Sequence, residues 1–374
     1  MLISQRSMPN QKPLNIQPKR ILVITLRYLG DTLLVTPLIA SLKQAYPDAD
    51  IDVLLPASNA GMLEGNQDIH RLLPITGKLG GLAFAKLLLS LFRRYDLAIS
   101  TQAGDRPTLC AAIAGKTRIG FVPDTAAKAW WKKVLLNRWL VFGADYGHAV
   151  LENLRFCKLL GIAPCYRLTP PRSSTPTPAL SDPYAILHIM PQWRYKQWHA
   201  EGWRELVAFL GRQGLQIVLT GSGNPAELDA LRELQQQLPA DVINLAGQLS
   251  LGQLSALIGK ARLFVGPDTG ITHLAAATGT LTVALFGPTD PEKWAPWPYA
   301  YSENKTPFAA RGSGQVQNVY LLQGQTEQDC LPCQLEGCDR HRNSHSACLD
   351  QLSSARVIDI ITQALQAKLP SVSG

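Results

Sequence analysis

The sequence predicts two α/β domains, each built on a parallel sheet, and three observations carry this prediction. In both halves of the 374-residue chain, short aliphatic runs alternate with longer amphipathic stretches. Such alternation is typical of βαβ units with right-handed crossovers. A stretch rich in proline, serine and threonine, residues 167–183, interrupts the pattern and reads as a linker. With 46% hydrophobic residues, the chain can supply two cores.

In the first half, four runs have the composition of buried strands. The first, RILVITL, is almost continuously aliphatic, as expected of a strand covered on both faces. We expect a domain over residues 19–166, preceded by a disordered polar lead-in over residues 1–18. The four predicted strands are 20–26, 49–55, 95–101 and 117–122.

The second half repeats the alternation and predicts a domain over residues 184–350. A further helix is expected near 353–368, within a C-terminal segment 351–374 for which packing back on the first domain is one option. The predicted strands are 184–190, 215–221, 242–247, 261–268 and 281–289, and the predicted helices are 199–213, 224–238, 250–260 and one from about 270.

The charge balance narrows the classes of partner. A formal net charge of +8 points to nucleic acid, a phosphorylated substrate or an anionic membrane. No nucleic-acid recognition motif occurs, so we expect no nucleic-acid partner. The lack of GxGxxG and GxxxxGK[ST] weighs against a nicotinamide dehydrogenase and a P-loop NTPase. The N-terminus lacks the apolar core of a secretory signal, which predicts a cytoplasmic protein.

The stretch GPDTGITHLAAATG (266–279) carries the first candidate site. It follows a predicted strand and opens a helix, whose free N–H groups and partial positive charge suit a phosphate. Gly270 lets the backbone approach a ligand, Thr269 adds a hydroxyl, and His273 can donate to a phosphate oxygen. Asp268 either caps the helix or binds a ligand hydroxyl. An ordinary cap with a core-facing histidine fits the local pattern equally well.

Two further loops follow predicted strands. In LRYLGDTLLVTP (26–37), Asp31 can act as a general base toward an acceptor hydroxyl, or cap the next helix. In HIMPQWRYKQWHAEGW (188–203), Lys196 can stabilise the negative charge of a diphosphate leaving group. A solvated pair of Arg194 and Lys196 between packing tryptophans is the alternative. Together the three stretches predict transfer chemistry on a diphosphate-activated donor in an interdomain cleft.

A basic stretch mixes tryptophan with cations, as membrane-interface segments do. It is AAKAWWKKVLLNRWL (126–140), with Lys128, Lys132 and Lys133. An ordinary basic amphipathic helix is the alternative. We assign these lysines, with Arg27 of the first strand's loop, to a face that meets a phosphorylated acceptor or a membrane.

Four cysteines near the C-terminus are spaced C-x2-C-x4-C-x9-C, and the first pair has metal-ligand spacing. In a reducing cytosol, zinc is favoured over disulfides, and unliganded thiols are the alternative. We therefore predict a structural zinc site formed by Cys330, Cys333, Cys338 and Cys348.

Four segments resemble glycosyltransferase family 9, the ADP-heptose:lipopolysaccharide heptosyltransferases. The resemblance runs from about residue 20 to the C-terminus, and the L-R-x-x-G-D and D-T-G-x-x-H blocks are its specific motifs. The W-x-x-K-x-W spacing and the late cysteines look most like the heptosyltransferase III branch. The segments are 26–43, 188–198, 245–280 and 283–297.

The resemblance implies a GT-B fold, two Rossmann-like α/β domains facing across a cleft. It also implies an inverting, metal-independent transfer of heptose from ADP-heptose to a phosphorylated lipopolysaccharide core, at the inner face of the inner membrane and without a catalytic cofactor. Asp31 matches the family's general base and Lys196 its phosphate-contacting lysine. A type I or II transferase, another donor sugar or acceptor, and a non-catalytic binding protein remain alternatives. The expected donor-binding residues are Asp268, Thr269, Gly270, His273, Leu249, Glu227 and Arg194.

Overall fold

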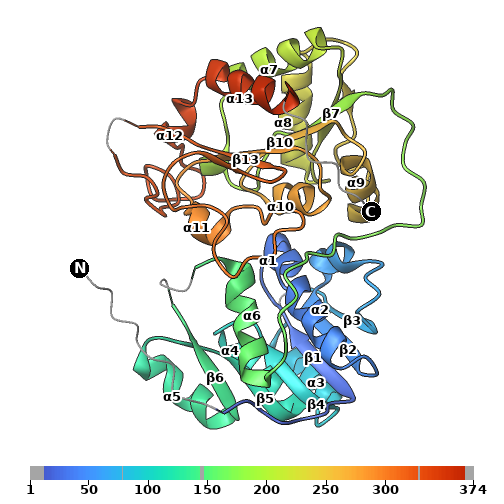
Figure 1. Cartoon of the computed structure of the whole chain (residues 1–374), viewed down its shortest axis with the longest axis vertical. Helices are drawn as coiled ribbons and strands as arrows, with labels where there is room; N and C mark the ends of the chain where they lie inside the picture. Colours follow the sequence, from blue (N-terminus) through green and yellow to red (C-terminus); the bar gives the residue numbers. More distant parts are fainter. Residues whose placement is uncertain (1–11, 78, 144–146, 327–328, 367–374) are drawn as a thin grey trace. The chain divides into compact units, whose positions relative to one another are not determined.

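The computed structural model describes residues 12–77, 79–143, 147–326 and 329–366 (Figure 1). The chain divides into two units, residues 1–169 and 170–374, and the division falls inside the segment predicted as a linker. Each unit is an α/β domain on a largely parallel sheet, which confirms the predicted fold class. Residues 1–11 of the expected lead-in and 367–374 of the expected C-terminal segment lie outside the described residues.

In the described part of the first unit, six parallel strands form one sheet in the order β3-β2-β1-β4-β5-β6. The four predicted strands are present. The sequence missed both edge strands, because Pro74 interrupts one run and the other lies inside the stretch taken as interfacial. The strands are β1 (Arg20–Ile24), β2 (Asp50–Pro56), β3 (Arg71–Ile75), β4 (Tyr95–Ser100), β5 (Gly115–Pro123) and β6 (Arg138–Phe142).

The direction in which the chain crosses the sheet decides which face each helix covers. From β3 through β4 and β5 to β6 the chain moves one way, so right-handed crossovers place α3, α4 and α5 on one face. The connection from β1 to β2 runs in the opposite direction across the sheet, so α1 and α2 cover the other face. Helix α6 packs against both of them. The helices are α1 (Leu29–Leu34), α2 (Thr36–Ala45), the 3-10 helix η1 (Ala57–Leu63), α3 (Gly81–Leu91), α4 (Asp105–Ala114), α5 (Ala126–Leu135) and α6 (Ala149–Leu160).

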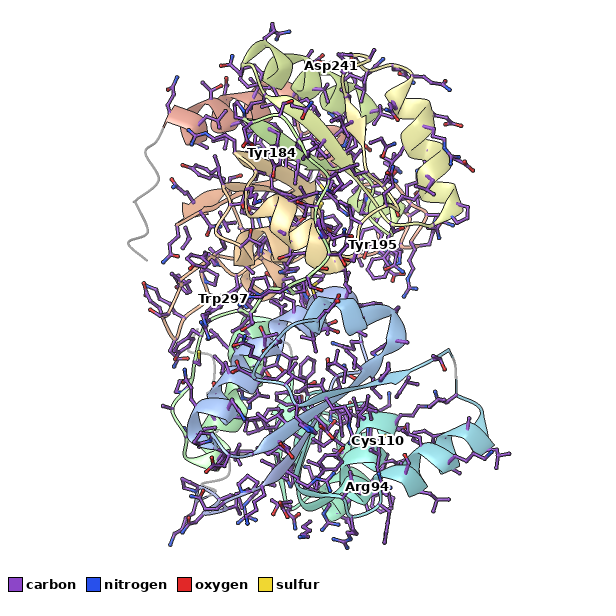
Figure 2. The ribbon with its side chains drawn as sticks, turned by 90° about the vertical axis from the view of Figure 1, so that its right-hand side faces the viewer. Arg94, Cys110, Tyr184, Tyr195, Asp241 and Trp297 are labelled. Atoms are coloured by element: carbon purple, nitrogen blue, oxygen red, sulfur yellow. The ribbon has the colours of Figure 1, made fainter. Side chains whose placement is uncertain are left out.

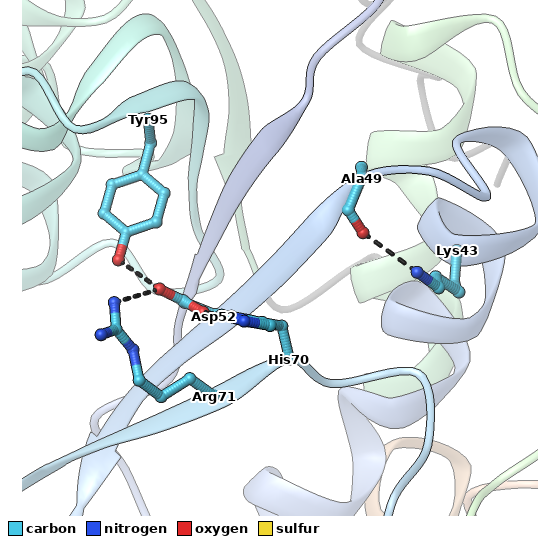
Figure 3. Close-up of polar contacts among 6 residues, drawn as sticks. All are labelled: Lys43, Ala49, Asp52, His70, Arg71 and Tyr95. Carbon is cyan, nitrogen blue, oxygen red and sulfur yellow. Dashed lines mark hydrogen bonds and ion pairs between the residues drawn. The ribbon is translucent and has the colours of Figure 1, made fainter.

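A buried carboxylate ties three strands together at the amino end of this sheet. Asp52 on β2 accepts hydrogen bonds from Tyr95 Oη at 2.7 Å and Arg71 Nη2 at 2.8 Å, and contacts His70 Nδ1 at 3.0 Å (Figure 3). Burial alone would raise the pKa of Asp52, but these three partners lower it below its ordinary value. The cluster lies opposite the carboxyl edge, where ligands bind α/β sheets, and we assign it a structural role.

In the described part of the second unit, seven strands form a sheet in the order β12-β13-β11-β10-β7-β8-β9. Only the β12–β13 pair is antiparallel. The sequence missed β12 and β13. The strands are β7 (Tyr184–His188), β8 (Gln216–Thr220), β9 (Ile243–Asn244), β10 (Leu263–Pro267), β11 (Thr282–Phe286), β12 (Gly314–Val316) and β13 (Val319–Gln323).

The last helix packs against α7 within the second unit, and its packing back on the first domain, one option left open by the sequence, stays a prediction. Val357, Ile361 and Ala364 of α13 share a core with Trp203 and Leu206 of α7, and the two helices lie side by side in Figure 1. The helices of this unit are the 3-10 helix η2 (Arg194–Lys196), α7 (Ala200–Arg212), α8 (Pro225–Gln235), α9 (Leu251–Ile258), α10 (Gly270–Ala277), α11 (Pro291–Trp294), α12 (Ala347–Asp350) and α13 (Ser354–Gln366).

Candidate active site

Four neighbouring strands of the second sheet bring the expected donor-binding residues to one edge. In the sheet, β11, β10, β7 and β8 are adjacent and parallel, so the loops that follow them leave from the same edge. Lys196 follows β7, Glu227 follows β8, and Asp268 follows β10. Polar groups at the carboxyl ends of parallel strands form the usual ligand site of such sheets.

The core of this site is an ion pair. Nζ of Lys196, on η2, lies 2.5 Å from Oδ2 of Asp268, directly after β10. Both side chains are largely buried, at 15% and 7% exposed. Nζ also lies 5.3 Å from the ring centre of Trp193 and 5.9 Å from that of Tyr195, which stack on each other. The lysine head is therefore held in place rather than solvated, contrary to the alternative left open by the sequence.

The charge of Asp268 is maintained by its neighbours. Burial would raise the pKa of its carboxyl, but Lys196, His273 and the hydroxyl of Thr289 together lower it. Thr289 follows β11, in the segment FGPTD, and sequence reasoning did not single it out. Its position one strand over from Asp268 was the available signal, but that required knowing that β11 lies beside β10.

Helix α10 begins beside this pair. Its N-cap is Thr269, whose side chain accepts from the N–H of Thr272, and Gly270 is its first residue. His273 is buried one turn in, and burial lowers its pKa to about 4, with Asp268 opposing this shift. Its ring is therefore neutral at pH 7. Nδ1 of His273 is buried and has no hydrogen-bond partner among the described residues, which is uncommon for a buried polar atom.

Glu227 lies at the neighbouring strand end. Its carboxylate accepts from the backbone N–H of Ser222 at 2.9 Å and from the Ser222 hydroxyl. A Cβ on Gly221 would lie 2.6 Å from Oε1 of Glu227, so this close approach requires glycine. Leu249 is half-buried just before the N-cap of α9, Ser250. Among the described residues, neither Leu249 nor Glu227 forms a hydrogen bond or ion pair with Lys196 or Asp268.

Arg194 begins the 3-10 helix that carries Lys196. It is exposed and lines a cavity of about 360 Å³ with Trp198, Trp203 and Glu233. Among the described residues, its guanidinium forms no ion pair with Asp268. Its assignment to the donor-binding set stays a prediction.

The late segment of the chain supports the lysine turn. Ser346 Oγ donates to the Tyr195 carbonyl at 2.6 Å, and Trp198 Nε1 donates to the Leu352 carbonyl at 2.7 Å. Figure 2 labels Tyr195 on this turn. These bonds span about 150 residues of sequence, with separations of 151 and 154. The tryptophans of the W-x-x-K-x-W spacing thus anchor the loop that presents Lys196.

In the first unit, Asp31 is the third residue of α1 and accepts from the backbone N–H of Tyr28 at 3.3 Å. It therefore has the capping role left open by the sequence, and this role does not exclude proton transfer. The buried side chain of Asn59, missed by the sequence, fixes the same turn. Its amide donates to the Arg27 carbonyl at 2.9 Å and to Thr32 at 3.0 Å.

The predicted cationic face is only partly as expected. Lys128 is exposed, and Lys133 lies 4.3 Å from the ring centre of Trp139. The prediction that Lys132 lies on this face is wrong. Its side chain is only 4% exposed, and Nζ binds Asp105 at 2.7 Å and the Ala103 carbonyl. It faces inward because α5 turns that side toward α4. The guanidinium of Arg27 lies over the Phe142 ring at 5.9 Å.

The four late cysteines are free thiols. Burial raises the pKa of Cys348 to about 12, and the nearby thiols of Cys333, Cys338 and Cys330 add to this shift. They are therefore close enough to influence one another. Within the described residues, however, no three histidine, cysteine, aspartate or glutamate side chains form a group that could hold a metal ion. The structural zinc stays a prediction.

The fold places the chain in the GT-B class. A family 9 glycosyltransferase from Veillonella parvula superposes with a TM-score of 0.72 at 19% identity, covering 93% of this chain and 97% of that one. An Escherichia coli heptosyltransferase solved with ADP gives a TM-score of 0.69 at 22% identity, covering 92% and 99%. Both superpositions cover almost the whole chain, and this likeness establishes the fold.

Sequence comparison gives the family. Residues 84–315 match the sequence model of the family "Glycosyltransferase family 9 (heptosyltransferase)". Lipopolysaccharide heptosyltransferase 3 of Escherichia coli K12 is 31% identical over 291 residues, covering 73% of this chain and 83% of the relative. The chain therefore belongs to glycosyltransferase family 9 and is a glycosyltransferase of the heptosyltransferase type.

Proposed function

We propose that the protein transfers heptose from ADP-heptose to the inner core of lipopolysaccharide and adds a branching heptose, the type III reaction. The observation that carries the proposal is the buried Lys196–Asp268 pair beside the first turn of α10. A lysine, a helix N-terminus and a neutral histidine together suit a diphosphate leaving group. The similarity to lipopolysaccharide heptosyltransferase 3 and the W-x-x-K-x-W spacing support the type III acceptor.

In the proposed reaction, the carboxylate of Asp31 takes the proton of the acceptor hydroxyl. The hydroxyl oxygen attacks the anomeric carbon of heptose and forms the new glycosidic bond. The bond from that carbon to the phosphate oxygen breaks with inversion, and ADP leaves with the electron pair. Lys196 and the N–H groups at the start of α10 stabilise the charge on ADP. In this proposal, Glu227 binds the ribose of ADP-heptose and Leu249 contacts its adenine.

The acceptor in this proposal is a phosphorylated, lipid-anchored core at the cytoplasmic face of the inner membrane. The net charge of +8 is consistent with it. The proposed chemistry needs no metal, so we assign any zinc held by the four late cysteines a structural role.

The test is transfer from ADP-heptose to purified core acceptors that carry no, one or two heptoses. ADP release and product mass are measured. Transfer only to the two-heptose acceptor is expected. Transfer to the heptose-free or one-heptose acceptor instead would assign type I or II. Tight ADP binding with no transfer to any acceptor would favour a binding protein or a different donor sugar.

The role of Asp31 is tested by Asp31→Asn, which keeps a side-chain oxygen for the Tyr28 N–H but cannot accept a proton. We expect unchanged ADP-heptose affinity and a turnover lowered by about 10² or more. The exposed Asp48→Asn variant is the matched control in the same unit. Unchanged turnover in Asp31→Asn would exclude this base.

A further inference from the structure

Exposed apolar side chains gather on two helices of the first unit. Among the described residues, eight large hydrophobic side chains are exposed, and five of them lie on α3, directly after it, or on α5. These five are between 60% and 76% exposed, more than any of the other three. Single exposed hydrophobics are common, but this concentration points to an interaction surface. They are Leu82, Leu89, Phe92, Trp130 and Val134.

On α3, the exposed leucines alternate with cations at helical spacing. Leu82, Lys86 and Leu89 are three or four residues apart on the helix and all exposed, so they share its outward side. Arg93 is exposed in the turn that follows the helix. The opposite side carries the residues that pack into the core of the unit. These core residues are Phe84, Leu87, Leu88 and Leu91.

Helix α5 has the same two-sided organisation. Ala129 lies in the same core as the inward residues of α3, and Lys132 is buried against Asp105. Trp130 and Val134 are one turn apart and exposed. Since the apolar side chains that point outward have no core to fill, they are available to a partner.

Both surfaces belong to one helical layer. Helix α4 contacts α3 on one side and α5 on the other, and all three cover the same face of the sheet. The turn after α3 is fixed to α4, because the Arg93 N–H donates to the Ile113 carbonyl at 2.9 Å. Arg106 of α4 donates to the Leu79 carbonyl and lies over the Phe84 ring. The exposed apolar side chains are therefore carried by a layer of fixed geometry.

The charge of this part of the chain is strongly positive. Residues 79–143 contain ten lysines and arginines and three aspartates. Two of those aspartates are engaged within the unit, Asp96 with Lys116 at 2.9 Å and Asp105 with Lys132. Cations beside exposed leucine, phenylalanine and tryptophan match an anionic lipid surface, which offers negative headgroups above an apolar layer. No helix among the described residues could span a membrane.

We infer that the outer surface of α3 and α5 docks on an anionic lipid bilayer. The leucines, Phe92 and Trp130 enter the headgroup boundary while Lys86, Arg93, Arg94 (labelled in Figure 2) and Lys128 meet the lipid phosphates. The surface gives the proposed function its access to a lipid-anchored acceptor, but the inference stands on exposure and charge. Binding of lipid alone tests it, without donor or acceptor.

The experiment is flotation of the full-length protein with vesicles of phosphatidylethanolamine and phosphatidylglycerol, and with phosphatidylcholine vesicles. We expect binding to the anionic vesicles that is at least about tenfold stronger and weakens with salt. The variant Leu89→Ser/Trp130→Ser should lower the partition coefficient about tenfold. The matched control is Tyr299→Ser/Leu335→Ser, which removes two exposed apolar side chains of the second unit and should bind as wild type.

Three outcomes would overturn the inference: no binding to anionic vesicles, equal loss in the control variant, or unchanged binding of Leu89→Ser/Trp130→Ser. Sedimentation in the absence of lipid is measured as well. Self-association that the double variant abolishes, without lipid binding, would assign the surface to a second copy of the chain. Because a water-soluble acceptor needs no membrane, its turnover in the double variant separates a failure of docking from a failure of the proposed function.

Discussion

Nζ of Lys196 and Oδ2 of Asp268 lie 2.5 Å apart, and they join two loops separated by 72 residues of sequence. A charge pair with this little exposure depends on both partners, since either one alone would remain buried without compensation. Lys196 also carries the positive charge proposed to meet the donor diphosphate. A change at Lys196 should therefore affect both the stability of the second unit and the proposed transfer reaction.

Replacement of this lysine should cost both stability and activity. In Lys196→Met, the Asp268 carboxylate keeps its burial but loses its counter-charge, so we expect the free energy of unfolding to fall by about 3 kcal/mol. Denaturant unfolding measures this change. The double variant Lys196→Met/Asp268→Leu should recover part of it, because no uncompensated charge remains. Exposed Lys260→Met is the control, and a Lys196→Met protein as stable as that control would contradict the prediction.

Two buried histidines make the second unit sensitive to acid. Burial lowers the pKa of both His188 and His273 to about 4, from an ordinary value near 6.5. Between these values the unfolded chain binds protons that the folded chain excludes, so the free energy of unfolding should fall as pH drops from 6.5 to 4. Above pH 6.5 these groups add no pH dependence. Asp268, whose pKa is lowered, contributes a separate loss only at more acidic pH.

Denaturant unfolding at several pH values measures this slope. The variant His188→Gln/His273→Gln should show a flatter profile between pH 6.5 and 4, because glutamine takes up no proton. A wild-type slope that the double variant retains would assign the acid sensitivity to other groups.

The positions of Lys196 and Asp268 after the ends of strands could be predicted from the sequence, because a run of aliphatic residues indicates a buried strand. Their contact could not. It depends on β10 lying beside β7 in the sheet, an order set by long-range packing rather than by local pattern. The hydroxyl of Thr289 was missed for the same reason.

The stretch 126–140 shows the complementary failure. Its tryptophans and lysines indicated a membrane-interface segment, but composition alone does not show which side chains point to the surface and which point inward. In the structure the stretch divides into α5 and the edge strand β6. Lys132 points toward Asp105, whereas Trp130, two residues earlier, is exposed. Because neighbouring helical residues point about 100° apart, one lysine of a charged run can be structural while the next is not.

The close approach of Gly221 to Glu227 gives a third prediction. In Gly221→Ala, the new Cβ would lie 2.6 Å from Oε1 of Glu227 and 2.8 Å from Cδ1 of Leu231, so the Glu227 carboxylate must shift from its place beside Ser222. If Glu227 binds the donor ribose, as proposed, ADP affinity should fall about tenfold. Isothermal titration with ADP measures it. Gly223→Ala is the matched control, since its nearest neighbour, Cα of Gly247, would lie 3.9 Å away. Equal affinities of the two variants would remove Glu227 from the donor site.

The four late cysteines give the last prediction. Protein purified from cells grown with zinc should hold about one zinc ion per chain, bound by Cys330, Cys333, Cys338 and Cys348. Their C-x2-C-x4-C-x9-C spacing supports this expectation. The metal would tie the segment 330–348 to the turn of Lys196, because Ser346 in that segment donates to the Tyr195 carbonyl. Chelation should therefore lower both the melting temperature and ADP affinity.

Elemental analysis measures the zinc content, and thermal unfolding measures the melting temperature. The decisive variant is Cys333→Ser/Cys338→Ser. It should lose the zinc and the chelator-sensitive part of the melting temperature. Cys165→Ser, outside the cluster, should retain both. If wild-type protein holds no zinc after purification with the metal, or if the double variant holds as much as wild type, the cysteines are ordinary thiols. In that case, hydrogen bonds such as the one from Ser346 would support the Lys196 turn without a metal.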